Sequence, residues 1–344
     1  MARPGVTHRF TLIRRNPALP LAIGLALCMA MPAALAQEYP VRPVRMLVGF
    51  PAGGATDLVA GLMAPKYGEA LRQPVIVERR PGNNGTAATS LTAKAAPDGY
   101  TINLATIGSL VILPALSKVS YDPMRDLAPV SQVVSMPNVF MVYPGAPTAK
   151  LNDLIALAKK TPRGLTYATA GNGMPGHLAG ELFKSMAKID ILEVKYKSHS
   201  AAIKDLVTGH INLLVAATST AVLQIKAGKA RALAVTASRR ISALPEVPTA
   251  EETGLGGYEA STWYGIVVPA GTPQRVIDRL HKETATILSM PEIERTLNAR
   301  GIEVSPTLPE QFFAYIKSET AKWTKVIHAT KGANSAAEKS ALNP

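Results

Sequence analysis

The chain has 344 residues, a formal net charge of +13 and a single cysteine, Cys28. That length suffices for two domains of ordinary size, and one cysteine excludes a disulfide framework and a cysteine-ligated metal site. The basic residues are scattered, without interleaved aromatic residues or zinc-finger spacing, so the composition does not indicate a nucleic-acid-binding protein. A small anionic ligand and plain solubility explain the positive charge equally well.

The first 36 residues have the features of a secretory signal peptide. Arginines without any acidic residue precede the apolar run 19–36, which ends in the small-x-small sequence Ala34-Leu35-Ala36. An uncleaved membrane anchor is the alternative, but Pro32 interrupts the run and the site pattern favours cleavage after Ala36. Cleavage removes Cys28 and four arginines, which takes the net charge from +13 to +9. No later apolar run approaches the roughly 20 residues of a membrane span, so we expect an exported, periplasmic protein.

Strand-like and helix-like segments alternate in the first part of the mature chain. Apolar strand-like runs lie at 44–50, 74–80 and 100–106. Glycine-containing turns follow the first two runs and lead into helix-like segments, the first of which begins at Asp57. Pro65 is expected to kink or shorten that helix. This order predicts a parallel sheet built from right-handed crossovers.

After residue 122 the alternation restarts with a long strand-like stretch, 128–144, that contains Pro137 in its middle. The pattern then predicts strands at 165–170, 191–197, 211–217, 230–237 and 261–271, and helices at 149–160, 177–187, 201–209, 219–229, 273–289 and 309–330. Residues from about 333 onward are expected to fray. The chain therefore contains two α/β units of similar construction.

A G-x-G-x-x-G sequence at residues 171–176 lies between a predicted strand and a predicted helix, with Glu193 in the next strand. That is the layout of a dinucleotide-binding turn. The mid-chain position, the restriction that Pro175 imposes on Met174 and the export of the protein argue against NAD(H) or NADP(H). A nucleotide-dependent enzyme therefore remains only an alternative, and we predict that the protein uses no cofactor.

Glycine turns at helix starts can also serve a different ligand. Unpaired N–H groups and the positive end of the helix dipole favour an anion there, and glycine lets a carboxylate or phosphate approach closely. Residues 51–54 form a second such turn. Ligands of open α/β sheets bind at the carboxyl ends of the strands, so two facing sheets would bring both turns to one cleft. Such turns also occur without any ligand, and that alternative stays open.

Seven segments, in one order, resemble the substrate-binding proteins of tripartite tricarboxylate transporters, which are also called Bug receptors. They are YPVRPVRMLVGFPAGGATD (39–57), PVIVERRPGNNGT (74–86), AAPDGYT (95–101), AGNGMPGHLAGELF (170–183), VKYK (194–197), RALAVTASRRISALPEVPTAEETG (231–254) and WYGIVVPAGTP (263–273). The resemblance extends from about residue 39 to about residue 320. It implies the Venus-flytrap fold of type II periplasmic binding proteins, with two parallel-sheet α/β domains joined by two crossover strands. It also implies capture of a small solute, often a carboxylate, that is sometimes passed to a membrane transporter.

This architecture predicts where the domains begin and end. The expected parts are a signal peptide (1–36), a discontinuous first domain (37–138 and 266–335), a second domain (139–265) and a flexible tail (336–344). The crossovers are expected near residues 137–144 and 258–266, where they can serve as a hinge. We expect a monomer.

The resemblance places the ligand contacts at the turns of both domains. In the first domain they are Phe50, Pro51, Ala52, Gly53, Gly54, Thr56, Asp57, Thr106 and Ser109, and in the second they are Thr169, Ala170, Gly171, Asn172, Gly173, Met174, His177, Tyr196 and Asp205. The chain departs from the family pattern at Arg79, at Gly82-Asn83-Asn84-Gly85, at Ser198 and at Gly61. The first two changes flank the expected cleft, so the ligand of other family members does not carry over to this chain.

Three of these residues have alternative roles. Asp57 can contact ligand or water, or it can cap the helix that it begins. A protonated His177 would oppose the dipole at a helix start, which favours a neutral histidine that forms hydrogen bonds. Tyr196 is either a donor in the cleft or a core aromatic residue.

Familiar catalytic motifs are absent from the sequence, which contains neither G-x-S-x-G nor H-E-x-x-H, and no paired histidines with metal-ligand spacing. We therefore predict a binding protein rather than an enzyme, with no bound metal. Its partners would be a small carboxylate and the membrane subunits of a transporter. A receptor that reports to a sensor kinase is the alternative.

Overall fold

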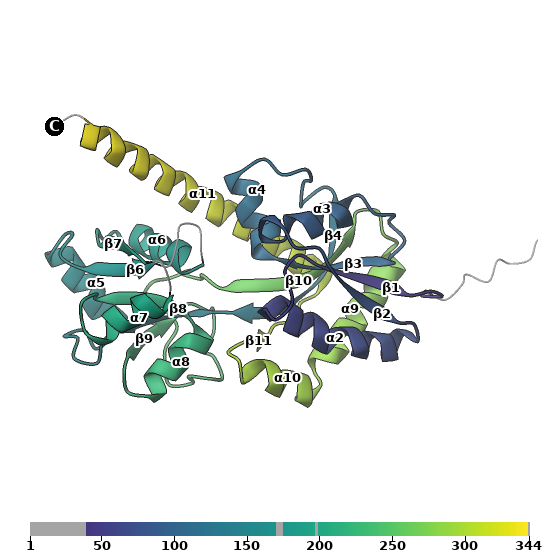
Figure 1. Cartoon of the computed structure of the whole chain (residues 1–344), viewed down its shortest axis with the longest axis horizontal. Helices are drawn as coiled ribbons and strands as arrows, with labels where there is room; N and C mark the ends of the chain where they lie inside the picture. The colour runs from purple at the N-terminus through teal and green to yellow at the C-terminus, as the bar shows by residue number, and fades with distance from the viewer. Residues whose placement is uncertain (1–38, 170–174, 197–198, 343–344) are drawn as a thin grey trace, which may run out of the picture. The chain divides into compact units, whose positions relative to one another are not determined.

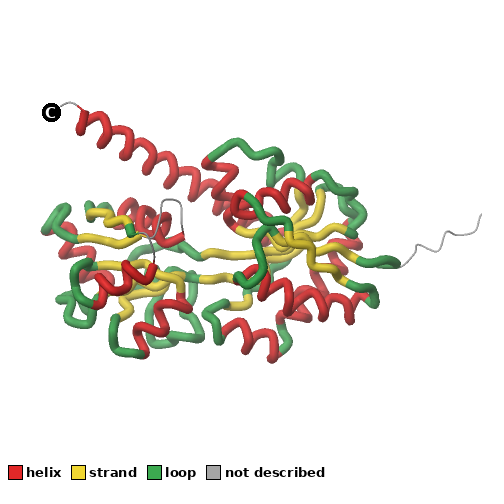
Figure 2. The backbone as a smooth tube through the Cα atoms, in the orientation of Figure 1, coloured by secondary structure: helices red, strands yellow, loops and turns green. Residues whose placement is uncertain are grey.

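The structure, a computed structural model, describes residues 39–169, 175–196 and 199–342. The part from Arg42 to Pro344 forms one unit, and its strands build a six-stranded and a five-stranded sheet (Figure 1). Figure 2 shows helices flanking both sheets. Two sheets with helices packed on them are the α/β arrangement that the alternating pattern of the sequence predicts.

The six-stranded sheet has the order β11-β4-β10-β3-β1-β2. Its strands are β1 (Val44–Val48), β2 (Val75–Arg79), β3 (Thr101–Thr106), β4 (Leu127–Met136), β10 (Thr262–Pro269) and β11 (Glu303–Val304). β1 pairs in parallel with β2 and β3, whereas β10 is antiparallel to β3 and β4. Every residue of β3 is buried, as expected for a central strand covered on both faces.

The helical segments that accompany this sheet come from both ends of the chain. They are α2 (Ala55–Leu71), the 3-10 turn η1 (Asn83–Gly85), α3 (Thr86–Ala93), the π-helical turn η2 (Gly108–Ile112), α4 (Leu113–Leu116), α9 (Gln274–Leu288), α10 (Pro291–Asn298) and α11 (Pro309–Leu342). Their apolar faces supply much of the core. α2, for example, buries Val59, Met63 and Tyr67, and the Tyr67 hydroxyl contacts Thr284 of α9.

The five-stranded sheet has the order β7-β6-β8-β5-β9. Its strands are β5 (Asn138–Val142), β6 (Thr166–Thr169), β7 (Leu192–Lys195), β8 (Leu213–Ala217) and β9 (Arg231–Val235), and its helices are α5 (Leu151–Lys160), α6 (Pro175–Ala187), α7 (His199–Val207) and α8 (Thr218–Lys226). β6 pairs in parallel with β7 and β8, and β5 is antiparallel to β8 and β9. Phe140, Phe183 and Tyr258 form an aromatic cluster in the core.

Both sheets are mixed: the parallel pairing that the sequence predicts is present among β1, β2 and β3 and among β6, β7 and β8, and antiparallel strands complete each sheet. Strands linked through helices pair in parallel, but the strands that lead from one sheet to the other run against them. β4 ends at Met136 in one sheet and β5 begins at Asn138 in the other, so Pro137 alone connects them. Proline has no N–H for a ladder, which explains why one strand-like stretch becomes two strands at this point. The chain returns to the first sheet between β9 and β10.

Three further segments differ from the sequence pattern. Pro65 was expected to kink or shorten α2, and it does not shorten it, because α2 continues from Ala55 to Leu71 through Pro65. Pro65 lies on the exposed side of α2, where water can satisfy the carbonyl that loses its partner, while Met63 and Tyr67 hold the helix on the core. α11 remains helical to Leu342, through residues expected to fray. α10 and β11 are short elements that the pattern did not reveal.

A buried carboxylate attaches α11 to β10. The Trp263 and Trp323 indole N–H groups both donate to Glu319 Oε2, at 3.1 and 3.0 Å. Lys322 also contacts Glu319, and its Nζ donates to the carbonyl of Glu259 at 2.8 Å.

In the described part of the chain, no helix combines the length and apolar character that a membrane crossing requires.

Candidate functional site

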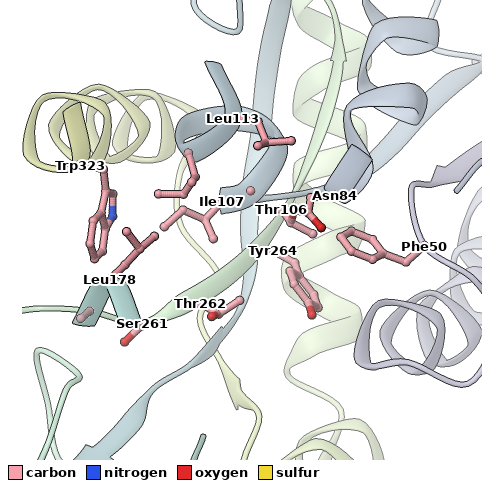
Figure 3. Close-up of a pocket in the computed structure, with 13 residues that line it drawn as sticks. Phe50, Asn84, Thr106, Ile107, Leu113, Leu178, Ser261, Thr262, Tyr264 and Trp323 are labelled. Atoms are coloured by element: carbon pink, nitrogen blue, oxygen red, sulfur yellow. The ribbon is translucent and has the colours of Figure 1, made fainter. Parts of the chain in front are cut away.

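A small cavity lies where the turns after β1 and β3 approach β10, α6 and α11. We call it the apolar cavity, and it has a volume of about 230 Å³. It is lined by Phe50, Asn84, Thr106, Ile107, Gly108, Ile112, Leu113, Leu178, Ala260, Ser261, Thr262, Tyr264 and Trp323 (Figure 3). None of these thirteen residues carries a charged side chain. The cavity is therefore suited to a small ligand whose body is largely apolar.

Glycines bring the first two turns of the chain together at one end of this cavity. A Cβ atom on Gly49 would lie 2.3 Å from the Cα of Gly85, so only glycine permits this approach. Gly85 has φ +92°, and a Cβ there would lie 3.1 Å from the Phe50 ring. Asn84 also has positive φ, at +49°, a conformation in which asparagine is enriched. The close approach places the Phe50 ring beside the Asn84 side chain.

Thr106 ends the buried strand β3 and faces the cavity. Its residue is buried, and its Oγ1 atom has no hydrogen-bond partner in the described part of the chain. Ser109 holds the turn behind it, because the Ser109 hydroxyl donates to the Thr106 carbonyl at 3.2 Å and the Ser109 carbonyl accepts from Tyr121 at 2.6 Å. A buried hydroxyl without a partner costs roughly 1–3 kcal/mol, so Thr106 is a candidate ligand contact.

Ser261, just before β10, is a second such hydroxyl. Its residue is buried, and its Oγ atom also lacks a hydrogen-bond partner among the residues that the structure describes. Tyr264 lies three residues further on, and burial raises the pKa of its phenol to about 12, so it stays neutral at physiological pH. Two unpaired hydroxyls, the Thr262 hydroxyl, the Asn84 amide and this phenol are thus polar groups that line the cavity.

The glycine turn at the start of α2 lines a different cavity. Gly53, Gly54 and Asp57 border a space of about 770 Å³, together with residues of α8 and of the segment after α10. The Asp57 carboxylate is already engaged, since Oδ2 accepts from the Gly53 N–H at 3.0 Å and Oδ1 accepts from Arg79 Nε at 2.7 Å. The Gly53 hydrogen bond and then Arg79 lower the pKa of Asp57. Arg79, at a departure from the family pattern, thus neutralises the carboxylate of this turn.

The predicted ligand contacts in and beside the five-stranded sheet have polar partners in that same part of the chain. The Thr169 hydroxyl donates to Glu193 Oε1 at 2.6 Å, and His177 Nε2 lies 3.8 Å from the same oxygen. His177 is buried, and this burial lowers its pKa, which agrees with a neutral histidine. Glu193, the acid of the dinucleotide-like pattern, therefore contacts Thr169 and lies beside His177. The Tyr196 hydroxyl donates to Asp205 Oδ2 at 2.6 Å.

The structure thus separates the predicted contacts into groups. Phe50 and Thr106 share the apolar cavity, and Gly53, Gly54 and Asp57 border the larger one. Pro51 and Ala52 are exposed, and Thr56 and Ser109 are buried away from both cavities. Ala170, Gly171, Asn172, Gly173 and Met174 lie outside the described residues.

Sequence reasoning missed several residues of the apolar cavity. Leu178, Ser261, Tyr264 and Trp323 line it without having been predicted. Asn84 was noted only as a departure from the family pattern. A usable signal existed for Ser261 alone, because a serine at the first position of an apolar strand-like run needs a hydrogen-bond partner once it is buried.

The chain forms two α/β units, strands cross between them, and a small cavity lies beside these strands. This arrangement defines the class of two-domain solute-binding proteins. Residues 59–331 match the family described as the tripartite tricarboxylate transporter family receptor. The chain belongs to this family, which consists of periplasmic solute-binding receptors and not of enzymes. The resemblance seen in the sequence is thereby confirmed.

Individual relatives are similar over nearly their whole length. The UPF0065 protein of the tcbD-tcbE intergenic region of Pseudomonas sp. is 36% identical over 308 residues, which cover 88% of this chain and 92% of the relative. BugT of Bordetella pertussis is 33% identical over 297 residues, with 86% and 91% covered.

Solved structures of similar proteins include two carboxylate complexes. An R. palustris protein with adipate is 32% identical, with a TM-score of 0.64 and 84% and 97% of the two chains covered. MatC from Rhodopseudomonas palustris with bound malate is 29% identical, with a TM-score of 0.63 and 84% and 100% covered.

Proposed function

We propose that this protein is a periplasmic receptor that captures a small organic carboxylate in the apolar cavity. The observation that carries the proposal is the pair of buried hydroxyls, Thr106 and Ser261, that line one cavity and have no hydrogen-bond partner among the described residues. A ligand that accepts hydrogen bonds from them would remove the cost of leaving them unpaired. Similar proteins with bound adipate and malate support a carboxylate as that ligand.

The charge of the chain supports an anionic ligand by a second route. Among the described residues, no charged side chain lines the apolar cavity, so the donors that they offer to a carboxylate are neutral. The net charge of +13 falls to +9 once the four signal arginines are removed, and such an excess attracts anions to the molecule. The field would therefore speed capture, while the hydroxyls and the Asn84 amide would provide the contacts.

The family supports delivery of the ligand to the membrane subunits of a tripartite tricarboxylate-type transporter. We propose that the signal peptide is cleaved after Ala36 and that the mature protein works in the periplasm. Signalling through a sensor kinase is the alternative, and no observation of this structure favours it.

Removal of each unpaired hydroxyl tests the proposal. We expect Thr106→Val and Ser261→Ala to weaken binding of a carboxylate probe, such as adipate or benzoate, by about tenfold, or about 1.4 kcal/mol. Because neither hydroxyl has a partner in the part of the chain that the structure describes, the free energy of unfolding without ligand should stay unchanged or rise slightly. Isothermal calorimetry and urea unfolding provide the two readouts.

The exposed Thr286→Val on α9 is the matched control, and its binding should equal that of the wild type. Native mass spectrometry of the purified protein would identify a co-purified ligand. If both cavity variants bind every carboxylate probe as tightly as the wild type does, the ligand lies elsewhere and the proposal fails.

A further inference from the structure

The apolar cavity has a polar end and an apolar end. A Cβ atom on Gly108 would lie 3.3 Å from Thr106 Oγ1 and 3.7 Å from the Asn84 Cβ, so these two side chains border the same spot. Figure 3 shows them beside Phe50 at one end, with Leu178 and Trp323 at the other. A ligand in the cavity would therefore be held by its polar group at one end and by apolar contacts at the other.

Trp323 contributes only apolar surface. Its indole N–H donates to Glu319 Oε2 at 3.0 Å, so this group is not available to a ligand. Leu178 and Ile107 complete that part of the wall. The hydroxyls of Ser261 and of the neighbouring Thr262 are the labelled polar groups nearest to Leu178 (Figure 3). A hydroxyl can pair with a neutral substituent of a ligand.

A second carboxylate would be poorly accommodated here. Burying a carboxylate without a cation is costly, and no charged side chain lines the cavity among the residues that the structure describes. A dicarboxylate would place one negative charge at Thr106 and Asn84 and the other against Leu178 and Trp323. One carboxylate can be offset by neutral donors at the polar end, but the nearest described donors to the other end are the hydroxyls of Ser261 and Thr262.

Size restricts the ligand further. The volume of about 230 Å³ lies below the usual range for ligand pockets, about 300–1,000 Å³. A compact body such as a six-membered ring or a branched alkyl group fits such a space better than a long chain. The rings of Phe50, Tyr264 and Trp323 supply flat aromatic walls, against which another ring packs well.

From these observations we infer that the ligand is a monocarboxylate with a compact apolar body, aromatic or branched aliphatic. The inference rests on the proposed function, because it assigns the chemical class of the carboxylate that the same cavity binds. It sets this chain apart from the relatives with bound adipate and malate, which are dicarboxylates.

A panel of probes on the wild-type mature protein tests the inference by calorimetry. Benzoate represents the inferred class, malate and adipate are the dicarboxylates, and benzamide is the uncharged analogue of benzoate. We expect benzoate to bind at least about tenfold more tightly than either dicarboxylate, in the range that an apolar pocket discriminates. Benzamide should bind more weakly than benzoate, because it lacks the carboxylate.

A pair of leucine variants locates the effect. Leu178→Asn makes the apolar end of the cavity polar, and we expect it to weaken benzoate binding by about tenfold while adipate binding changes little. Leu308→Asn changes a leucine that is 45% exposed and lines none of the cavities described here, so it should alter neither. Circular dichroism would verify that both variants are folded.

The outcomes separate the two levels of the claim. Tighter binding of malate or adipate than of benzoate would overturn the inference and leave the proposed function standing. Binding of benzamide with no binding of any carboxylate would overturn the proposed function as well. Equal effects of Leu178→Asn on benzoate and adipate would also contradict the inference, because both ligands would then occupy the apolar end.

Discussion

At the level of single residues, the first glycine turn shows how a carboxylate at a helix start is held by its neighbours. Asp57 lies in α2 and accepts from the Gly53 N–H and from Arg79, the last residue of β2, which pairs with β1. The negative charge is thereby neutralised within the protein. Asp57 thus stabilises the turn through protein contacts, and Arg79 accounts for its presence there.

The lowered pKa of Asp57 predicts a defined pH dependence. A carboxylate with a lowered folded-state pKa contributes stability above its unfolded pKa, about 3.9, and loses it as the pH falls through the folded value. Asp57→Asn should therefore lower the free energy of unfolding at pH 7 by less than about 1 kcal/mol, because the pair with Arg79 is partly exposed and screened. Urea unfolding at pH 7 and pH 3 measures the difference, which should narrow at pH 3. A constant difference at both pH values would contradict this assignment.

At the level of elements, close backbone contact decides how the first two turns meet. Gly49 and Gly85 belong to segments that follow β1 and β2, and the absence of side chains lets the segments touch. This contact places Phe50 and Asn84 at the cavity. The geometry of the site therefore depends on two glycines that contact no ligand themselves.

Alanine at Gly49 tests this dependence. Its Cβ would overlap the backbone of Gly85, so we expect Gly49→Ala to cost about 1–3 kcal/mol of unfolding free energy, as for other overpacked sites. Carboxylate binding should weaken as well. Gly61→Ala is the matched control, because a Cβ atom at this position would meet nothing within 4 Å. Alanine also favours a helix more than glycine does, so this variant should stabilise the protein by about 1 kcal/mol. A melting temperature of Gly49→Ala that equals or exceeds that of the wild type would refute the argument that Gly49 and Gly85 must approach closely.

The attachment of α11 is a second property at this level. Glu319 accepts hydrogen bonds from two buried indoles, so Glu319→Ala would leave both N–H groups without a partner. We expect a loss of about 3–5 kcal/mol, as when one member of a buried charged network is removed. Glu310→Ala, exposed on the same helix, should stay within about 0.5 kcal/mol of the wild type. Tryptophan fluorescence follows unfolding directly, and a small effect at Glu319 would show that water replaces it.

For the whole molecule, the two connections between the sheets lie side by side. The Asn138 side chain and the Thr236 hydroxyl both donate to the Ala260 carbonyl, at 2.9 Å each, and the Asn138 N–H donates to the Thr236 hydroxyl at 2.8 Å. Pro137 lies immediately before this group. We propose that the domain boundaries run through these connections and that they act as the hinge on which the two domains close.

Closure predicts a change in overall dimensions. Small-angle scattering should show a smaller radius of gyration at saturating benzoate than without ligand, because a hinge closes both domains on a bound solute. Thr106→Val at the same benzoate concentration serves as the control and should compact less. An unchanged radius of gyration for ligand-saturated wild type would exclude closure.

Local patterns in the sequence determined most of the elements. Apolar runs located the strands, glycine turns located the helix starts near Ala55 and Thr86, and the order of segments indicated two α/β units. These features depend on neighbouring residues, and their signals are therefore contained in short windows. The resemblance to a receptor family also identified Phe50 and Thr106, which both line the apolar cavity.

Only the tertiary structure decided how the cavity is composed. Asn84, Leu178, Ser261 and Trp323 lie far apart in the sequence and meet because the chain crosses twice between the sheets and α11 returns to β10. The antiparallel course of the crossing strands was hidden for the same reason, since pairing between distant strands leaves no trace in a local pattern. Burial then decided which hydroxyls are candidate ligand contacts, because packing leaves Thr106 and Ser261 without a hydrogen-bond partner among the described residues.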